Sequence, residues 1–184
     1  MKTKVIKAIS ILLISGIVFS CTACGKSKNN EPDDNTPTET VSNEVDFEAH
    51  GNLLEEKTSG EMIKVVSSTN ELNAFIDDSK SQVDFTPLLT ALDKYNDAYF
   101  EDQSLLILWK NVGFPDSVEV DKVERIVHSD DSVQYTVDIT CTTYTVQAHP
   151  AIPVAYCLLI ELNKDADLIE NNITANWKSV ENIN

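Results

Sequence analysis

Hydrophobic and polar residues alternate most regularly over residues 133–141, where every second side chain is apolar or aromatic. A period of two is typical of a strand with one buried and one exposed face. Residues 105–109 are apolar throughout, and this lack of alternation indicates a strand buried on both faces. Val118 begins a further strand, whose change of apolar phase predicts a β-bulge near Asp121 and Lys122.

Two stretches that precede these strands show helical spacing. Ser68 and Glu71 form a capping box, in which the serine oxygen accepts a backbone N–H and the glutamate reaches back. Apolar residues follow at intervals of three and four, which predicts a helix over residues 69–79. Thr86 and Pro87 suit the N-cap and the first position of a second helix, which is predicted to end near residue 96.

Together these elements predict an α+β fold. Residues 62–67 and 154–162 add two strands, and residues 169–180 are a candidate edge strand. Helices followed by consecutive strands with short turns are typical of helices packed on one face of an antiparallel sheet. We therefore expect residues 61–184 to form two helices packed on an antiparallel β-meander of about four to six strands, after a disordered linker.

The first 23 residues have the pattern of a signal peptide. Three lysines at positions 2, 4 and 7 accompany an apolar run that ends at Phe19. This run is shorter than the roughly 20 apolar residues that a transmembrane helix needs, and it has the length of a signal-peptide core.

Cys21-Thr22-Ala23-Cys24 follows this run directly. Small residues before a cysteine at this place resemble a bacterial lipobox, in which the leader is cut before the cysteine and its thiol is diacylated. Cys24 fits best because Thr22 and Ala23 precede it; lipidation at Cys21 and ordinary cleavage without a lipid are the alternatives. The resemblance implies a protein that a diacylglyceryl group on Cys24 anchors to the cell membrane on its extracytoplasmic face.

Residues 24–60 are predicted to be a flexible acidic linker. Residues 25–44 contain one apolar side chain, Val41, so this stretch cannot bury enough surface to offset the entropy of ordering. Residues 46–60 leave two alternatives, because Phe47, Leu53 and Leu54 either dock on the domain or form a short helix ahead of it.

Charge excludes two classes of function. The 184-residue chain has a formal net charge of −16. A chain so acidic lacks the basic surface that binds nucleic acid by counterion release, and its charge does not attract anionic lipid headgroups. Membrane contact must then come from the N-terminal lipid.

No residue pattern in the chain indicates catalysis, a cofactor or a metal. His50, His128 and His149 are far apart in sequence, and no metalloprotease, nucleophile-elbow or phosphate-loop motif is present. The neighbouring acids Asp97 and Glu101 are best explained as a solvated helix-to-strand connection. We therefore predict that the protein is not an enzyme, with a hydrolase as the less favoured alternative.

Three segments resemble the PrcB C-terminal-like domain, which occurs in small lipoproteins of Firmicutes and in a protease-complex subunit. They are S-x-x-E-L-x-x-F from Ser68, Y-x-D-x-x-F-E-D-x-x-L-L-I from Tyr95, and I-E-L-x-K from Ile160. The resemblance implies an accessory or complex-stabilising role beside another extracytoplasmic protein. A small-ligand-binding lipoprotein is the alternative, although a single domain of this size offers little room for a cleft.

A meander also predicts where a partner binds. Alternate connections of a meander lie at the same end of the sheet, which would bring residues 111–117 and 145–153 together. Both segments carry apolar side chains, and the predicted partner-binding residues are Phe114, Pro115, His149 and Ile152. The alternative is that these side chains fold down and cap the core.

Two cysteines are candidates for a disulfide. If residues 132–144 and 154–162 form a hairpin centred on His149, Cys141 and Cys157 lie directly opposite each other. Opposed Cβ atoms are roughly 4.5–5.5 Å apart, close to disulfide spacing, and an extracytoplasmic location permits oxidation. Two buried, unbonded cysteines are the alternative.

Overall fold

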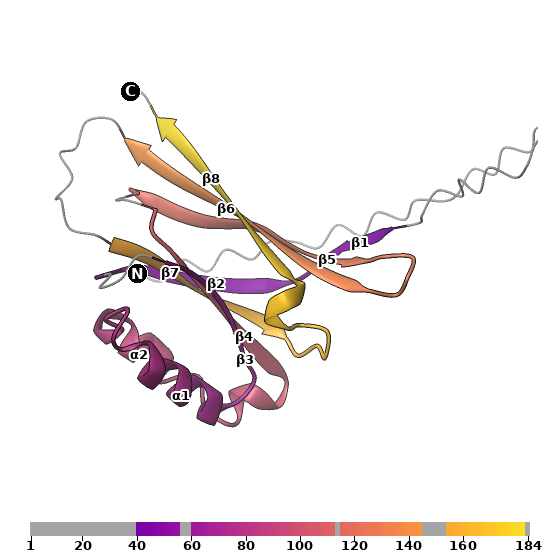
Figure 1. Ribbon diagram of the computed structural model, residues 1–184, viewed down its shortest axis with the longest axis horizontal. Helices are drawn as coiled ribbons and strands as arrows, with labels where there is room; N and C mark the ends of the chain where they lie inside the picture. Colours follow the sequence, from indigo (N-terminus) through magenta and orange to yellow (C-terminus); the bar gives the residue numbers. More distant parts are fainter. Residues whose placement is uncertain (1–39, 56–59, 113–114, 145–153, 183–184) are drawn as a thin grey trace, which may run out of the picture. The chain divides into compact units, whose positions relative to one another are not determined.

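The computed structural model describes residues 40–55, 60–112, 115–144 and 154–182. Its strands form two four-stranded sheets that pack face to face as a sandwich, and helices cover the outer face of one of them (Figure 1). Sheet I has the order β1-β5-β6-β8, and sheet II has the order β2-β7-β4-β3. The strands are β1 (Val41–Glu44), β2 (Phe47–Glu55), β3 (Glu61–Val66), β4 (Gln103–Lys110), β5 (Ser117–Val127), β6 (Val133–Tyr144), β7 (Val154–Asn163) and β8 (Ile173–Asn182).

The predicted fold class, two helices on an antiparallel meander, is wrong. Consecutive strands β6 and β7 lie in different sheets, and β8 returns beside β6 in parallel. The reason lies in sheet II, whose central strands β4 and β7 are apolar on both faces. Helices cover one face of this sheet, and the second sheet covers the other. The described residues form eight strands, more than the four to six that were expected.

Helix α1 (Thr69–Ser79) begins and ends where it was predicted. The Ser68 hydroxyl accepts the backbone N–H of Glu71 at 3.2 Å, which confirms the serine half of the capping box. The Glu71 carboxylate reaches back one residue further than expected, to the N–H of Ser67 at 2.7 Å. Leu72 and Phe75 are buried against sheet II.

The second predicted helix is much shorter than expected. A 3-10 turn η1 (Thr86–Leu88) leads into α2 (Leu89–Leu92), and the chain then turns. The Asn96 side chain accepts the N–H groups of Ala98 and Tyr99 at 3.0 and 3.2 Å, at the start of η2 (Tyr99–Glu101). The helical stretch has already ended by then, because the chain turns after Leu92 and the Tyr95 N–H donates to the Leu92 carbonyl at 3.0 Å.

The described part of the chain has two apolar layers. One lies between the helices and sheet II, and its centre is Trp109, whose ring centroid is 6.0 Å from that of Phe75 and 5.9 Å from that of Phe85. The other lies between the two sheets and includes Leu106, Val137 and Ile160. Trp109 belongs to the run 105–109, and the prediction that this run is a strand buried on both faces is confirmed: 2% of Trp109 is exposed.

Strand β5 carries the irregularity that its sequence predicted. Its register against β6 shifts between Val120 and Lys122, which confirms the predicted bulge. Strand β8 confirms the candidate edge strand, and it lies at the margin of sheet I.

The predicted boundary between linker and domain is wrong. Strands β1 and β2 lie within the segment 24–60 that was assigned to a flexible linker, and they pair with β5 and β7. Of the alternatives left for residues 46–60, docking is correct for Leu54, which is 1% exposed. The four side chains of β1 are all exposed, so this strand is held by backbone pairing, which apolar content does not reveal. Residues 25–39 lie outside the described residues.

The disulfide prediction is also wrong, because both Cys141 and Cys157 are unbonded and buried. Their strands do not form a hairpin: Cys141 lies opposite Val118 in sheet I, and Cys157 lies opposite Trp109 in sheet II. Cys141 contributes to the layer between the sheets, whereas Cys157 contributes to the layer under the helices.

An ionic clasp, formed by Arg125, Tyr135, Asp165 and Asp167, holds the connection from sheet II back to sheet I. Arg125 on β5 donates from Nε to Asp165 at 2.9 Å and from a terminal nitrogen to Asp167 at 2.8 Å. The Tyr135 hydroxyl donates to the same oxygen of Asp165. The clasp therefore fixes the path of the chain between β7 and β8.

Candidate functional site

Most of the predicted site residues lie outside the described part of the chain. This holds for the lipidation site Cys24 and for Phe114, His149 and Ile152 of the proposed partner surface. Pro115 is described, and it is buried rather than exposed, which contradicts its assignment as a surface contact. The strand ends that flank the two segments do meet, because the Asp116 N–H donates to the Thr142 carbonyl at 2.8 Å.

The structure brings together a group that the sequence did not suggest. Along β2, Phe47 and Ala49 point into the layer between the sheets, so the alternate residues Glu48 and His50 point to the helix side of sheet II. On the neighbouring strand β7, Glu161 is the direct cross-strand partner of Glu48. The ligand atoms of Glu48, His50 and Glu161 all lie within 4.8 Å of one another. We call these three residues the β2–β7 cluster.

Glu161 is the centre of the β2–β7 cluster. Its Oε1 atom lies 3.3 Å from His50 Nε2 and accepts a hydrogen bond from the Tyr95 hydroxyl at 3.1 Å. The Lys94 ammonium contacts the same oxygen and also lies over the Tyr95 ring. The Glu161 side chain is 15% exposed and that of His50 is 48% exposed, so the cluster is open to solvent on the β2 side.

The neighbouring tyrosines are protonated donors. Burial, together with the negative charge of Glu161, raises the pKa of Tyr95 well above its ordinary value, and the same causes raise the pKa of Tyr99. The Tyr99 hydroxyl donates to the Ser104 carbonyl at 3.2 Å. Neither phenol can therefore serve as a base at ordinary pH.

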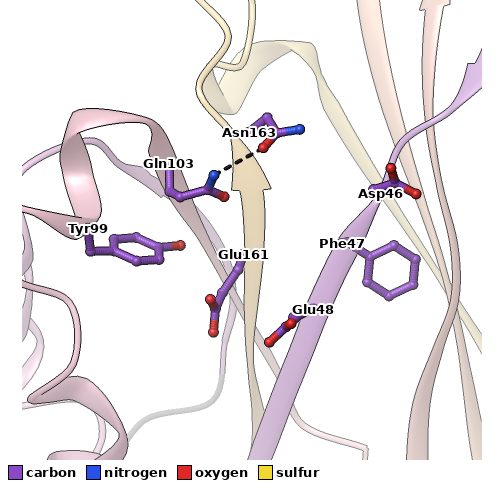
Figure 2. A pocket seen from close by; sticks show the side chains of 7 residues that line it. All are labelled: Asp46, Phe47, Glu48, Tyr99, Gln103, Glu161 and Asn163. Carbon is purple, nitrogen blue, oxygen red and sulfur yellow. Dashed lines mark hydrogen bonds between the residues drawn. The ribbon is translucent and has the colours of Figure 1, made fainter. Parts of the chain in front are cut away.

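A pocket of about 480 Å³ opens beside the β2–β7 cluster. Figure 2 shows the Glu48 and Phe47 side chains on opposite sides of β2, with Tyr99 and Glu161 on the Glu48 side. Gln103 donates to Asn163 at 3.0 Å. The lining residues are Asp46, Phe47, Glu48, Tyr99, Gln103, Glu161 and Asn163. Because three of these carry carboxylates, the pocket favours a cation over an anion.

Among the described residues, the acids near the start of β4 do not form a site of this kind. Asp97, Glu101 and Asp102 are exposed, as expected for a solvated connection, and Asp97 accepts a hydrogen bond from the Thr69 hydroxyl at 2.6 Å. His128 lies at the turn between β5 and β6, where its N–H donates to the Ser132 carbonyl.

The β2–β7 cluster was missed because the pairing of β2 with β7 is not visible in the sequence. One signal was present: Phe47-Glu48-Ala49-His50 alternates apolar with titratable residues, which is a strand pattern. That pattern lies within the segment 24–60, whose polar first half favours a linker.

Comparison with protein-family models, with curated proteins and with solved structures finds no match to this chain. The resemblance to the PrcB C-terminal-like domain therefore stays a prediction. In the described ranges, no helix has both the length and the apolar character that crossing a membrane requires.

Proposed function

We propose that the protein is a lipid-anchored, extracytoplasmic, non-enzymatic interaction module that binds an extended segment of another extracytoplasmic protein along strand β8. The observation that carries this proposal is the open edge of sheet I. Strand β8 is ten residues long and pairs with β6 on one side, and no other described strand pairs with its outer edge.

An edge strand presents a row of backbone N–H and C=O groups that can pair with another chain. Natural proteins usually block such edges with proline, bulges, charges or short strands. Strand β8 has neither proline nor glycine, and Lys178 and Glu181 are its only charged residues. A long and weakly protected edge is the feature that strand addition uses.

The edge of sheet II at β3 is blocked by a side chain from another segment. The Glu170 carboxylate accepts the backbone N–H of Val65 at 3.3 Å and the Lys64 ammonium at 2.7 Å. Glu170 belongs to η3 (Glu170–Asn172), the turn that leads directly into β8. The β1 edge of sheet I is only four residues long. Strand β2, the other edge of sheet II, is nine residues long, but it contains a glycine and the titratable residues Glu48, His50 and Glu55. These contrasts favour β8 as the partner-binding edge.

The side chains of β8 suit such a partner. Ala175 and Trp177 are half-buried against the layer between the sheets, whereas Asn176 and Lys178 are exposed on the outer face. An added strand would place alternate side chains beside Trp177 and beside these polar residues, which gives sequence selectivity to backbone pairing.

The N-terminal pattern supports the anchor. The apolar run and the small residues before Cys24 motivate lipidation there. From Cys24 to the first residue of β1 is 41 − 24 = 17 residues, which span at most about 60 Å when fully extended. A protein tethered in this way works on partners close to the membrane surface. Intact-mass analysis of the membrane-extracted protein is expected to show a diacylated N-terminal Cys24, and an N-terminal Cys21 or an unlipidated mature form would contradict it.

The binding proposal is tested by site-specific photo-crosslinking in intact cells. A photoreactive residue at Asn176 is expected to capture one extracytoplasmic protein through a defined extended segment, mapped by mass spectrometry, while the same residue at Glu101 captures none. Lys178→Pro and Ser179→Pro then provide a matched pair. Backbone N–H groups alternate in direction along β8, so one of these prolines breaks the ladder to β6 and the other blocks only the outer edge.

The proline variant that keeps the wild-type melting temperature is expected to lose the crosslink. Persistence of the crosslink in that variant, or capture only of a second copy of this chain, would contradict the proposed partner mode.

A further inference from the structure

We propose that the β2–β7 cluster binds a divalent transition-metal ion of the Zn²⁺ class, with one imidazole nitrogen and two carboxylate oxygens as protein ligands. This site is separate from the β8 edge and does not depend on it. Its three residues, Glu48, His50 and Glu161, come from two adjacent strands of sheet II, so a rigid scaffold positions them.

The spacing of two of the ligand atoms already matches a tetrahedral site. With metal–ligand distances of about 2.0–2.1 Å, the ligands of a tetrahedral Zn²⁺ ion lie about 3.3–3.4 Å apart. His50 Nε2 and Glu161 Oε1 are 3.3 Å apart. The Glu48 carboxylate lies within 4.8 Å of both, so a small side-chain rotation on the exposed β2 edge completes a three-ligand set.

The electrostatics of the strand pair favour a cation, and the Lys94 ammonium supplies one in this structure. Glu48 and Glu161 are direct cross-strand partners on the same face, an arrangement in which like charges destabilise a sheet. Asp46 adds a third carboxylate to the adjoining pocket. A divalent ion between the carboxylates converts this repulsion into ligation.

Two side chains on the helix side of sheet II, those of Tyr95 and Lys94, contact the ligand Glu161. The Tyr95 hydroxyl donates to Glu161 and holds its carboxylate in place, as residues that orient metal ligands do. The Lys94 ammonium contacts the same oxygen, and it is the group that a metal ion must displace. Lys94 is exposed enough to swing away, since 43% of its side chain is accessible.

The ligand set selects among metals. Ca²⁺ and Mg²⁺ prefer six or more oxygen ligands, and an imidazole nitrogen with two carboxylates suits Zn²⁺ or a similar transition-metal ion better.

The test is calorimetric titration of the full-length protein in detergent micelles with ZnSO₄ alone. One equivalent of Zn²⁺ is expected to bind, and His50→Gln and Glu161→Gln are each expected to weaken binding at least tenfold. His128→Gln is the matched control and is expected to bind as the wild type does. Excess CaCl₂ is expected not to compete.

Two further measurements distinguish a specific metal site from nonspecific binding of the ion to acidic side chains. Lys94→Met is expected to strengthen Zn²⁺ binding several-fold, whereas Lys122→Met, which removes a lysine on sheet I, is expected to leave it unchanged. Co²⁺ bound to the wild type is expected to give the intense visible bands of tetrahedral coordination, and to lose them in His50→Gln.

Melting temperatures of all variants show whether the fold is intact, and His50→Gln decides the outcome if Glu161→Gln is unstable. Binding that His50→Gln leaves unchanged, or that Ca²⁺ abolishes, would overturn the proposal.

Discussion

The ionic clasp between β5 and the β7–β8 connection is expected to be a measurable source of stability. Replacing Arg125 with methionine keeps most of the apolar stem and removes both charge-assisted hydrogen bonds, to Asp165 and to Asp167. A hydrogen bond to a charged group contributes about 1.5–3 kcal/mol when it is buried, whereas exposed ion pairs contribute about 0.2–1 kcal/mol. The Arg125 side chain is 29% exposed and that of Asp165 is 28% exposed, so an intermediate value applies.

We therefore expect Arg125→Met to lower the free energy of unfolding by about 1–2 kcal/mol. For a domain of this size, that loss corresponds to a fall in melting temperature of roughly 3–6 °C. Urea titration at pH 7 measures the free energy directly. Lys122→Met, which removes a lysine ion pair from the same strand, is the control and is expected to leave the free energy of unfolding unchanged within error.

The clasp also makes a prediction about pH. Partial burial opposes ionisation of Asp165, but hydrogen bonds from Tyr135, from the Asp167 backbone and from Arg125 outweigh it, and the pKa of Asp165 is lowered from 3.8. A carboxyl whose pKa is lower in the folded state contributes stability above its unfolded pKa, and that stability is lost as the pH falls through the folded value.

The stability difference between wild type and Arg125→Met should therefore be full at pH 6 and shrink below about pH 4. An Arg125→Met variant within about 0.5 kcal/mol of the wild type at pH 7, or a difference that grows in acid, would refute this account of the clasp.

Two further predictions concern the buried side chains. Trp109→Ala is expected to lower the free energy of unfolding by about 3–5 kcal/mol, because Trp109 packs against Phe75 and Phe85 at the centre of the layer under the helices. Urea titration measures this loss, and a loss below about 1 kcal/mol would contradict the packing. Cys141 and Cys157 are expected not to react with a thiol reagent in the native protein at pH 8, because burial raises the pKa of both thiols, that of Cys157 to about 12. Both are expected to react after denaturation without reductant. A missing thiol at that stage would mean that they form a disulfide.

The features that were predicted correctly are those that short segments determine. Helix α1 is set by Ser68 at its start and by apolar spacing along its length, and the bulge in β5 is set by a phase change within one strand. Each of these signals lies within about ten residues of the structure it specifies. The early end of α2 is also local, but apolar periodicity does not detect the turn after Leu92, in which the Tyr95 N–H donates to the Leu92 carbonyl.

The partition of strands between two sheets was not predictable in this way. The disulfide prediction assumed that β6 and β7 pair because they are adjacent in sequence, yet β7 pairs with β2 and β4 instead. One clue was available: a strand buried on both faces needs cover on both faces, and two short helices supply only one. The apolar run 105–109 therefore indicates a second layer, but it does not indicate which strands form that layer.

The candidate cation site shows the same limit at the level of single residues. Glu48 and Glu161 are 161 − 48 = 113 residues apart in the chain, and only the register of β2 against β7 makes them neighbours. Once that register is fixed, the alternation of β2 decides which side chains meet, because Phe47 and Ala49 must face the layer between the sheets. The burial of two apolar residues thus places Glu48 and His50 beside Glu161. The strand order separates the two proposed sites, because β2 and β8 are edge strands of different sheets. Substitutions in the cation site and in the partner-binding edge are therefore expected to act independently.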